Sequence, residues 1–308
     1  MARIFIDGEA GTTGLQIRQR LEKRSDLELL VIGESERKDR AARAEMLNMA
    51  DVAILCLPDG AARESVSLIR NGTTRVIDAS TAFRVAEDWV YGFAEMDEAQ
   101  SDRIRGAVRV ANPGCYPQGP ILFLRTLIRA GLLPADYPFT INAISGYSGG
   151  GRRMIEDFAA KGDSASPYFP YGLDFHHKHV PEMVVNGTLE QAPLFQPAVG
   201  NYAQGMMTLV PLHLDHLEKK VSGADIHGAM GEHLARIANS HVELAGLNEM
   251  AGPEDLNPQA LNGTDRMRLY VFADEERRQA LLVAVYDNLG KGSSGAAVQN
   301  LDLMLGRT

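Results

Sequence analysis

Cys115 is the side chain of this sequence best placed to act as a nucleophile. It lies in the run NPGCYPQGP at 112–120, where prolines and glycines precede an apolar stripe with helical spacing that begins at Ile121. Amide dipoles at the start of a helix favour the thiolate, which is the reactive form of cysteine. An inert buried cysteine is the alternative, and it is the role we expect of Cys56, which lies inside the apolar run DVAILCL.

Three histidines, His176, His177 and His179, lie close together and are followed by Glu182. If the segment is extended, His177 and His179 point to the same face. A histidine paired with Cys115 would act as general base and later as general acid, because its pKa lies near neutral pH. Two other interpretations stay open. The histidines can be a structural pair, or a His-x-His zinc site that still needs a third ligand, which the local sequence does not identify.

A glycine-rich turn follows the first apolar run, at 3–7. Such a turn lets backbone amides approach a pyrophosphate closely at the start of a helix. Ala10 stands where many dinucleotide-binding turns have a second early glycine, so the turn is a variant of the common pattern. A purely structural turn is the alternative. The candidate cofactor-binding residues of this turn are Gly8, Gly11, Thr12, Thr13 and Gly14.

The residues after the second apolar run, at 27–32, bear on the choice of cofactor. Glu34 can accept ribose hydroxyls, which favours NAD. Ser35, Arg37 and Lys38 follow at once and can hold a 2′-phosphate, which favours NADP. A solvated loop is the third interpretation. We expect NADP.

Two shorter segments are suited to binding anions. The segment SGYSGGGR at 145–152 offers backbone amides beside an arginine, and it includes Ser148 and Gly149. Arg84 follows the apolar run that ends at Asp78, and ligands of open α/β sheets bind beyond the carboxyl ends of the strands. Either segment can equally be an ordinary loop.

The elements that must position these residues indicate two kinds of domain. Strand-like runs at 3–7, 27–32, 51–57 and 74–78 alternate with helical patterns, which is typical of βαβ units in a mostly parallel sheet. Further strand-like runs lie at 139–144, 205–211, 268–272 and 280–286, with helical patterns at 121–128 and 224–238. We therefore predict an α/β protein with an N-terminal Rossmann dinucleotide-binding domain and a C-terminal α+β domain.

Composition narrows the class of protein further. The 308 residues are enough for about two domains. A net charge of -9, from 31 basic and 40 acidic residues, argues against nucleic acid as a partner. Two cysteines cannot form a disulfide framework. The chain shows no signal-peptide pattern and no apolar run of about 18 residues, so we expect a cytoplasmic protein without a membrane partner.

Taken in order, the segments FIDGEAGTTG, DASTAFR, NPGCYPQGP, SGYSGGGR, HKHVPE and NLGKGSSGAAVQN resemble those of N-acetyl-γ-glutamyl-phosphate reductases, in particular the short form. The resemblance implies NADPH-dependent reduction of N-acetyl-γ-glutamyl phosphate to N-acetylglutamate 5-semialdehyde and phosphate, in arginine biosynthesis. It implies a fold like that of glyceraldehyde-3-phosphate and aspartate-semialdehyde dehydrogenases. The expected domains are a NADP-binding domain at 1–114 plus 291–308, and a catalytic and oligomerisation domain at 115–290. The assembly implied is a homodimer or homotetramer.

The resemblance also implies roles for individual residues. Cys115 aligns with the nucleophile that forms a thioester. We favour His179 as the acid/base residue, with His177 second, and Glu182 is a further catalytic candidate. The other expected contacts are Arg84 and Asn112 for the substrate and its phosphate, and Ser148 and Gly149 for the cofactor, with no metal ion.

Other functions predict different observations. An aspartate-semialdehyde dehydrogenase would use the same chemistry on a shorter, unacetylated substrate. A non-catalytic NADP-binding regulator would show no substrate-protected alkylation of Cys115. A cysteine hydrolase would leave the glycine-rich turn without a role, and a zinc hydrolase would bind stoichiometric metal. Residues 33–50 leave room for one helix between two strands, so the adenosine pocket is the least direct inference from the family.

Overall fold

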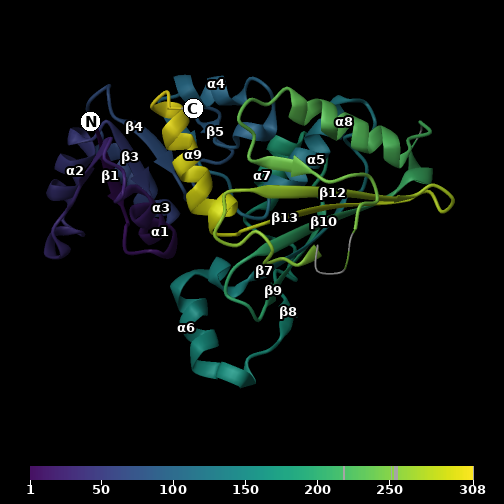
Figure 1. The fold of residues 1–308 in the computed structure, drawn as a ribbon. Coiled ribbons are helices and arrows are strands. Elements are labelled where there is room, and N and C mark those ends of the chain that lie inside the picture. The colour runs from purple at the N-terminus through teal and green to yellow at the C-terminus, as the bar shows by residue number, and fades with distance from the viewer. Residues whose placement is uncertain (218, 251, 253–255, 308) are drawn as a thin grey trace. The chain divides into compact units, whose positions relative to one another are not determined.

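The computed structural model describes residues 1–217, 219–250, 252 and 256–307. The chain forms two compact units (Figure 1). The first unit comprises residues 1–94, 101–113 and 293–308, and the second comprises residues 95–100 and 114–292. From the sequence, NADP binding is expected of residues 1–114 and 291–308, and catalysis and oligomerisation of residues 115–290. That assignment of functions stays a prediction.

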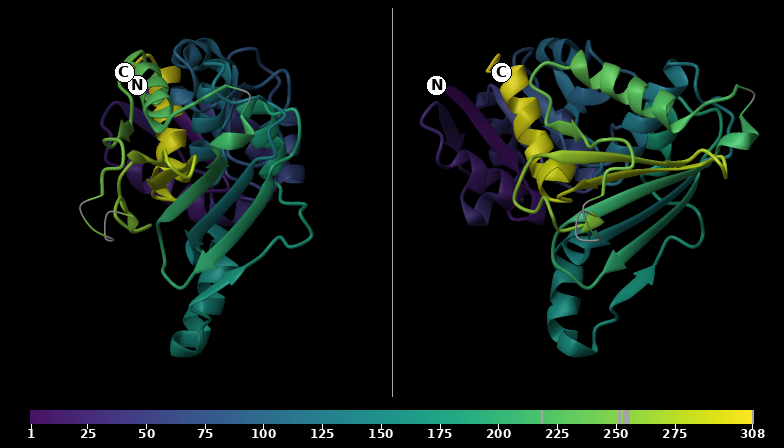
Figure 2. Two further views of the ribbon diagram at one scale, coloured as in Figure 1. Left: turned by 90° about the vertical axis from the view of Figure 1, so that its right-hand side faces the viewer. Right: turned by 45° about the vertical axis from the view of Figure 1, so that its right-hand side comes forward.

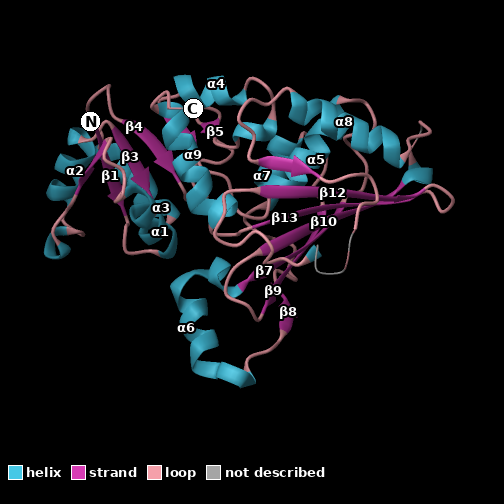
Figure 3. Cartoon of the chain, in the orientation of Figure 1, coloured by secondary structure: helices cyan, strands magenta, loops and turns pink. Residues whose placement is uncertain are grey.

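The first unit is built on a six-stranded parallel sheet with the strand order β2-β1-β3-β4-β6-β5. Helices alternate with these strands along the chain (Figure 3). The strands are β1 (Ala2–Asp7), β2 (Leu27–Leu30), β3 (Val52–Leu55), β4 (Arg75–Asp78), β5 (Val90–Tyr91) and β6 (Arg109–Ala111). The helices are α1 (Thr12–Leu21), α2 (Arg40–Met49), α3 (Asp59–Leu68), most of α4 (Gln100–Gly106) and α9 (Gly295–Met304).

Both faces of this sheet are buried, which explains why its strands read as continuous apolar runs. Successive side chains of β1 point to opposite faces. Ile4 and Ile6 pack in one cluster with residues of α1 and α9, whereas Phe5 packs in the other with residues of α2 and α3. The C-terminal helix α9 therefore completes the core of the N-terminal sheet, with Leu301 fully buried.

The second unit is built on a seven-stranded mixed sheet with the order β11-β12-β13-β10-β7-β9-β8. Strands β7 and β9 pair in parallel, and so do β11 and β12, while the other neighbours are antiparallel. The strands are β7 (Thr140–Gly146), β8 (Tyr168–Pro170), β9 (Leu194–Gly200), β10 (Met206–His213), β11 (Val242–Leu244), β12 (Met267–Asp274) and β13 (Gln279–Tyr286). The helices are α5 (Gln118–Arg129), α6 (Gly151–Lys161), α7 (Val180–Gly187) and α8 (Gly223–Ala235).

Helix α5 is the element that positions Cys115. Its residues from Gln118 to Leu124 are all buried, because the helix packs directly against the mixed sheet. Gly119 permits this approach, since a Cβ there would lie 2.6 Å from the hydroxyl of Thr208 and 2.7 Å from the Cβ of Ala284. In contrast, α6 extends away from the sheet of the same unit (Figure 2).

The predicted fold class is confirmed: an α/β unit with a parallel sheet and a second unit that mixes strands and helices. Two local expectations differ from the structure. The segment at 145–152 is not an ordinary loop, because a 3-10 turn at Tyr147–Gly150 leads directly into α6. The histidine segment is not extended either, because it ends in α7, with His179 as the residue before its first turn. Within the part of the chain that the structure describes, no helix has both the length and the apolar content needed to cross a bilayer.

Candidate functional site

Cys115 lies in the turn that leads into α5, and its side chain is half-buried. Tyr286 of β13 holds the main chain at Cys115 and at the residue that follows it. The Tyr286 hydroxyl donates to the carbonyl oxygens of Cys115, at 2.7 Å, and Tyr116, at 3.3 Å. Complete burial raises the pKa of this phenol far above its usual value, so it stays a neutral donor.

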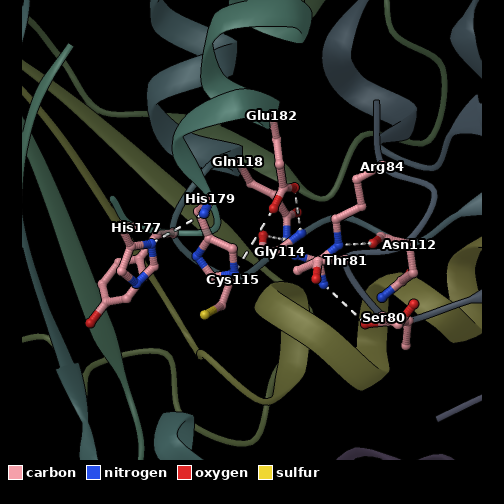
Figure 4. Close-up of polar contacts among 12 residues, drawn as sticks. Ser80, Thr81, Arg84, Asn112, Gly114, Cys115, Gln118, His177, His179 and Glu182 are labelled. Atoms are coloured by element: carbon pink, nitrogen blue, oxygen red, sulfur yellow. Dashed lines mark hydrogen bonds and ion pairs between the residues drawn. The ribbon is translucent and has the colours of Figure 1, made fainter. Parts of the chain in front are cut away.

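Glu182 connects the Cys115 turn with the histidine segment (Figure 4). Its Oε2 accepts a hydrogen bond of 3.0 Å from the amide of Gly114, the residue before Cys115. Its Oε1 lies 3.9 Å from Nε2 of His179. Glu182 belongs to the first turn of α7, where the helix dipole favours a carboxylate, and its side chain is almost wholly buried. One carboxylate therefore faces both the backbone beside the thiol and an imidazole.

His179 packs within the same group of side chains. Its ring centroid lies 5.8 Å from that of Tyr116, the residue after Cys115. The histidine is 5% exposed, which limits the access of water to its ring. Glu182 and Tyr116 thus bring His179 to the backbone on both sides of Cys115.

His177 has a different environment, although its ring centroid is only 4.8 Å from that of His179. Its Nδ1 accepts a hydrogen bond of 3.2 Å from the amide of His179. Its Nε2 lies 3.3 Å from the hydroxyl of Tyr171. Burial lowers the pKa of His177 to about 4, with a smaller contribution from Lys178. His177 is therefore neutral at neutral pH, and both its nitrogens are used to orient the segment.

Four residues near Cys115 were not among the sequence candidates. Gln118 donates from Nε2 to the carbonyl of Lys291 at 2.9 Å, and Lys291 forms a buried ion pair with Glu95. A Cβ at Gly292 would lie 3.1 Å from the Cβ of Cys115. Gln118 lies in the segment NPGCYPQGP, and Lys291 and Gly292 lie in NLGKGSSGAAVQN, whereas Glu95 lies in no motif. Membership of these two segments was the signal that could have identified Gln118, Lys291 and Gly292.

Among the described residues, no group of three or more histidine, cysteine, aspartate or glutamate side chains is arranged to hold a metal ion. The zinc interpretation of the histidine pair requires such a third ligand.

The glycine-rich turn connects β1 with α1 at the point where the strand order reverses, between β1 and β3. Gly8 has φ +91°, and a Cβ there would lie 2.4 Å from the carbonyl oxygen of Cys56. A Cβ at Gly14 would lie 2.5 Å from the carbonyl oxygen of Gly8. Gly11 precedes α1, so Thr12 and Thr13 belong to the first turn, where backbone amides lack partners within the helix. The geometry fits an anion at this helix start.

A cavity of about 240 Å³ opens beside this turn, and its lining includes Gly8, Glu9, Ala10, Arg37, Lys38 and Arg43. Arg37 lies 3.3 Å from Glu9, whereas Arg43 is held at 3.0 Å by the buried Asp7. Ser35 is exposed in the 3-10 turn at Glu34–Glu36 and does not line the cavity. A glycine turn for a pyrophosphate, next to Arg37 and Lys38 for a further phosphate, suits a dinucleotide such as NADP.

The two residues expected at the substrate's phosphate lie in the first unit and are both buried. Arg84 donates to the carbonyl oxygens of Asn112 and Ala79, each at 3.0 Å. The Asn112 side chain donates to the carbonyl of Ser293 at 3.1 Å and accepts from Asn300 at 3.0 Å. Asn112 therefore joins α9 to the end of β6, and its role toward a substrate stays a prediction.

Ser148 and Gly149 lie in the second unit, in the turn after β7. The Ser148 amide donates to the carbonyl of Ala203, and its hydroxyl accepts from Asn288, both at 3.0 Å. A Cβ at Gly149 would lie 3.0 Å from the hydroxyl of Ser145. Since the Ser148 groups already have partners, its expected contact with a cofactor also stays a prediction.

Comparison with known proteins gives matches along most of the chain. The family of semialdehyde dehydrogenase NAD-binding domains matches residues 3–104, and the family of semialdehyde dehydrogenase dimerisation domains matches residues 115–288. A protein named N-acetyl-gamma-glutamyl-phosphate reductase from Chelativorans sp. is 63% identical, over 99% of this chain and 98% of its own. One of the same name from Mesorhizobium japonicum is 62% identical, over 99% of both chains.

Solved structures show the same fold at low sequence identity. Aspartate semialdehyde dehydrogenase II from Vibrio cholerae, complexed with ASA, is 16% identical and superposes with a TM-score of 0.70, over 99% of this chain and 98% of that one. Aspartate semialdehyde dehydrogenase with NADP from Candida albicans is 13% identical with a TM-score of 0.67, over 100% of this chain and 99% of that one. These likenesses confirm the fold predicted from the sequence.

Proposed function

The chain belongs to the N-acetyl-γ-glutamyl-phosphate reductase family, and on that premise we propose that it reduces N-acetyl-γ-glutamyl phosphate to N-acetylglutamate 5-semialdehyde and phosphate, with NADPH, in arginine biosynthesis. The family confirms the resemblance drawn from the motifs. The observation that carries the proposed chemistry is the position of Glu182, whose carboxylate contacts both the amide before Cys115 and His179.

Cys115 acts as the nucleophile. Its thiolate attacks the acyl carbon of the substrate, the C–O bond to phosphate breaks, and inorganic phosphate leaves with that bond's electron pair. The product of this step is a thioester on Cys115, so one difficult reduction is divided into two easier steps. Backbone amides at the start of α5 stabilise the oxyanion that forms at the acyl carbon.

His179 acts as the acid/base residue, and Glu182 orients its imidazole. A carboxylate next to an imidazole stabilises the imidazolium, so His179 can take the thiol proton before attack. The resulting imidazolium donates that proton to the oxygen that becomes negatively charged when the thioester is reduced, which gives the thiohemiacetal hydroxyl. Collapse of the thiohemiacetal to the aldehyde then returns the thiolate, and His179 takes the hydroxyl proton back. His177 is the second candidate only, because both its nitrogens have partners and its pKa of about 4 makes it a weak base.

The residues of the glycine turn and the adjacent cavity would hold the cofactor. Gly8, Gly11 and Gly14 would admit the pyrophosphate against the start of α1, and Arg37 and Lys38 would bind the 2′-phosphate that distinguishes NADP from NAD. When bound, NADPH supplies the hydride that reduces the thioester. Ser35 is the weakest of these candidates because it is exposed and outside the cavity lining.

Arg84 is the candidate for the departing phosphate, since a guanidinium can bind two phosphate oxygens at once. We propose that Asn112 holds Arg84 in place, because the main-chain carbonyl oxygen of Asn112 accepts a hydrogen bond from Nε of Arg84. Ser148 and Gly149 remain candidates for binding the cofactor, because they lie in the turn after β7.

The enzyme is proposed to be a homodimer or homotetramer. Its second unit matches a family described as a dimerisation domain. Several large apolar side chains there are about half exposed or more, which is typical of a surface covered in an assembly. They are Tyr168, Leu173, Phe175, Val185 and Leu194. Light scattering after size-exclusion chromatography will show the assembly, and a monomer would contradict it.

We propose a cytoplasmic location. Cys56 and Cys115 are both free thiols, which suits a reducing compartment.

Replacement of Cys115 by serine tests the proposed function. We expect Cys115→Ser to lower kcat by at least about 10³-fold, because it removes the thiolate on which the thioester forms. The assay follows NADPH formation from N-acetylglutamate 5-semialdehyde, NADP and phosphate, with aspartate semialdehyde as the rival substrate. Cys56→Ala is the matched control and keeps its activity. Retained turnover by Cys115→Ser would refute the thioester mechanism, and faster turnover of aspartate semialdehyde would refute the substrate.

A further inference from the structure

A fully buried ion pair lies in the second unit and takes no part in the chemistry proposed above. Nζ of Lys291 lies 2.8 Å from Oε1 and 2.7 Å from Oε2 of Glu95, and neither side chain is exposed. Oε1 of Glu95 also accepts a hydrogen bond of 3.1 Å from the amide of His241. Since the ammonium group is directed to Glu95 and away from solvent, Lys291 does not bind substrate in this position.

The backbone of Lys291 contacts the Cys115 turn on its other side. Lys291 lies in a π-helical turn, Gly290–Ser294, in which the amide of Gly292 donates to the carbonyl of Asp287 at 2.8 Å. The Lys291 carbonyl accepts from Gln118 at 2.9 Å, at the start of the helix that follows Cys115. The approach at Gly292 is so close that a Cβ there would lie 3.1 Å from the Cβ of Cys115.

We propose that Lys291 and Glu95 form a positioning pair, which holds the turn at 290–292 against the Cys115 turn and thereby sets where the nucleophile stands. The proposal rests on the proposed function in one respect, that Cys115 is the nucleophile. An ion pair shielded from water holds its elements firmly, because separating the partners leaves uncompensated charges in the interior. Single π-helical turns are frequent at functional sites, where they place particular backbone groups.

A double variant, Lys291→Met with Glu95→Gln, tests the proposal because it removes both charges and keeps similar side-chain volumes. We expect kcat to fall by about 10- to 100-fold while KM for the acyl phosphate changes little, since a small displacement of a reacting group has an effect of that size. We also expect a changed rate of alkylation of Cys115 by iodoacetamide, measured in the absence of substrate by mass spectrometry of the peptide that contains it.

Asp97→Asn is the matched control. Asp97 lies two residues from Glu95 and pairs with Arg125 at 3.1 Å and Arg129 at 3.4 Å, so it secures the same segment without contacting the turn at 290–292. We expect a lower Tm for Asp97→Asn, with kcat and the alkylation rate of Cys115 unchanged. If the double variant likewise lowers Tm alone, the pair is merely structural and the proposal is overturned.

Gln118→Met gives a second test that does not disturb the ion pair, in case the double variant fails to fold. It removes the hydrogen bond to the Lys291 carbonyl, and we expect a smaller loss of kcat and a change of alkylation rate in the same direction. An unchanged alkylation rate in folded Gln118→Met would overturn the proposal. Alkylation requires no acyl phosphate, so altered alkylation in a protein without reductase activity would refute the proposed function and support the positioning pair.

Discussion

The two units position their functional groups by different means. In the first unit the candidate cofactor site is formed largely by the main chain. Gly8 and Gly14 allow neighbouring backbone segments to approach each other more closely than any side chain would permit. In the second unit the candidate site depends on buried charged side chains, with Glu182 directed at Gly114 and His179, and Lys291 at Glu95. Substitution of a turn glycine in the first unit should therefore act through steric exclusion, whereas substitution of Glu182 in the second should act through the loss of a polar contact.

Among the substitutions that test this comparison, Gly8→Ala is expected to have the largest effect. The alanine would have to adopt φ +91° with its Cβ 2.4 Å from a backbone oxygen of Cys56, so the turn must shift. We expect the Kd for NADPH to rise at least about 100-fold, or about 3 kcal/mol, in a fluorescence titration. Gly60→Ala is the control, because nothing lies within 4 Å of its added Cβ. Alkylation of Cys115 should stay as it was, and if the Kd also stays unchanged, the turn does not bind the cofactor.

Glu182→Gln probes the second unit and should have an effect of intermediate size. The amide keeps its shape and can still accept from Gly114, but it no longer stabilises an imidazolium at His179. A charge-assisted contact is worth about 1.5–3 kcal/mol, so kcat should fall by about 10- to 100-fold, with KM little changed in steady-state assays. Glu190→Gln, at an exposed position just after the same helix, serves as control. An unaltered kcat would show that Glu182 supports only the fold.

Arg37→Ala should have a smaller effect, because the arginine side chain is 38% exposed and water screens its charge. We expect the Kd for NADPH to rise about tenfold, or about 1.4 kcal/mol, while the Kd for NADH stays the same. Arg40→Ala removes a neighbouring charge that lies outside the cavity lining, and it should alter neither Kd. Equal losses for the two nucleotides would mean that Arg37 does not recognise the 2′-phosphate.

The smallest effect on turnover is expected from Asp78→Asn, which changes how stability depends on pH. Burial raises the pKa of Asp78 to about 6, so the folded protein retains a proton that the unfolded chain has lost. This contribution to stability is present below about pH 4 and is lost as the pH rises to about 6. Relative to the unaltered protein, Asp78→Asn should therefore gain a few degrees of Tm between these limits. A Tm difference independent of pH in calorimetry would contradict this.

The comparison of the units also explains what the sequence could reveal. The glycine turn was recognisable because turns of this kind need glycine at particular positions in a contiguous segment. Arg37 and Lys38 were expected near it because the carboxyl ends of parallel strands meet at one edge of the sheet. Ser35 was grouped with them as a cofactor-binding candidate, and it lies exposed in a 3-10 turn. Its contact with the cofactor stays a prediction.

Long-range polar contacts were beyond the reach of local patterns. Glu95 and Lys291 are 196 residues apart in the chain, and neither position carries a periodic signal that would link them. The local pattern identified the histidine segment but not its conformation. His177 and His179 would share a face only if the segment were extended. The segment instead turns into α7, and the two imidazoles have different partners.

The position of α9 has a consequence for biosynthesis. Residues such as Ala297 and Leu301 belong to the same hydrophobic cluster as Ile4 and Ile17, so the sheet of the first unit is completed by residues that are translated much later. While the ribosome is still making the intervening segment, that apolar surface has no permanent cover. The nascent N-terminal half must stay soluble until α9 emerges, and this is the interval in which a chaperone would be most useful.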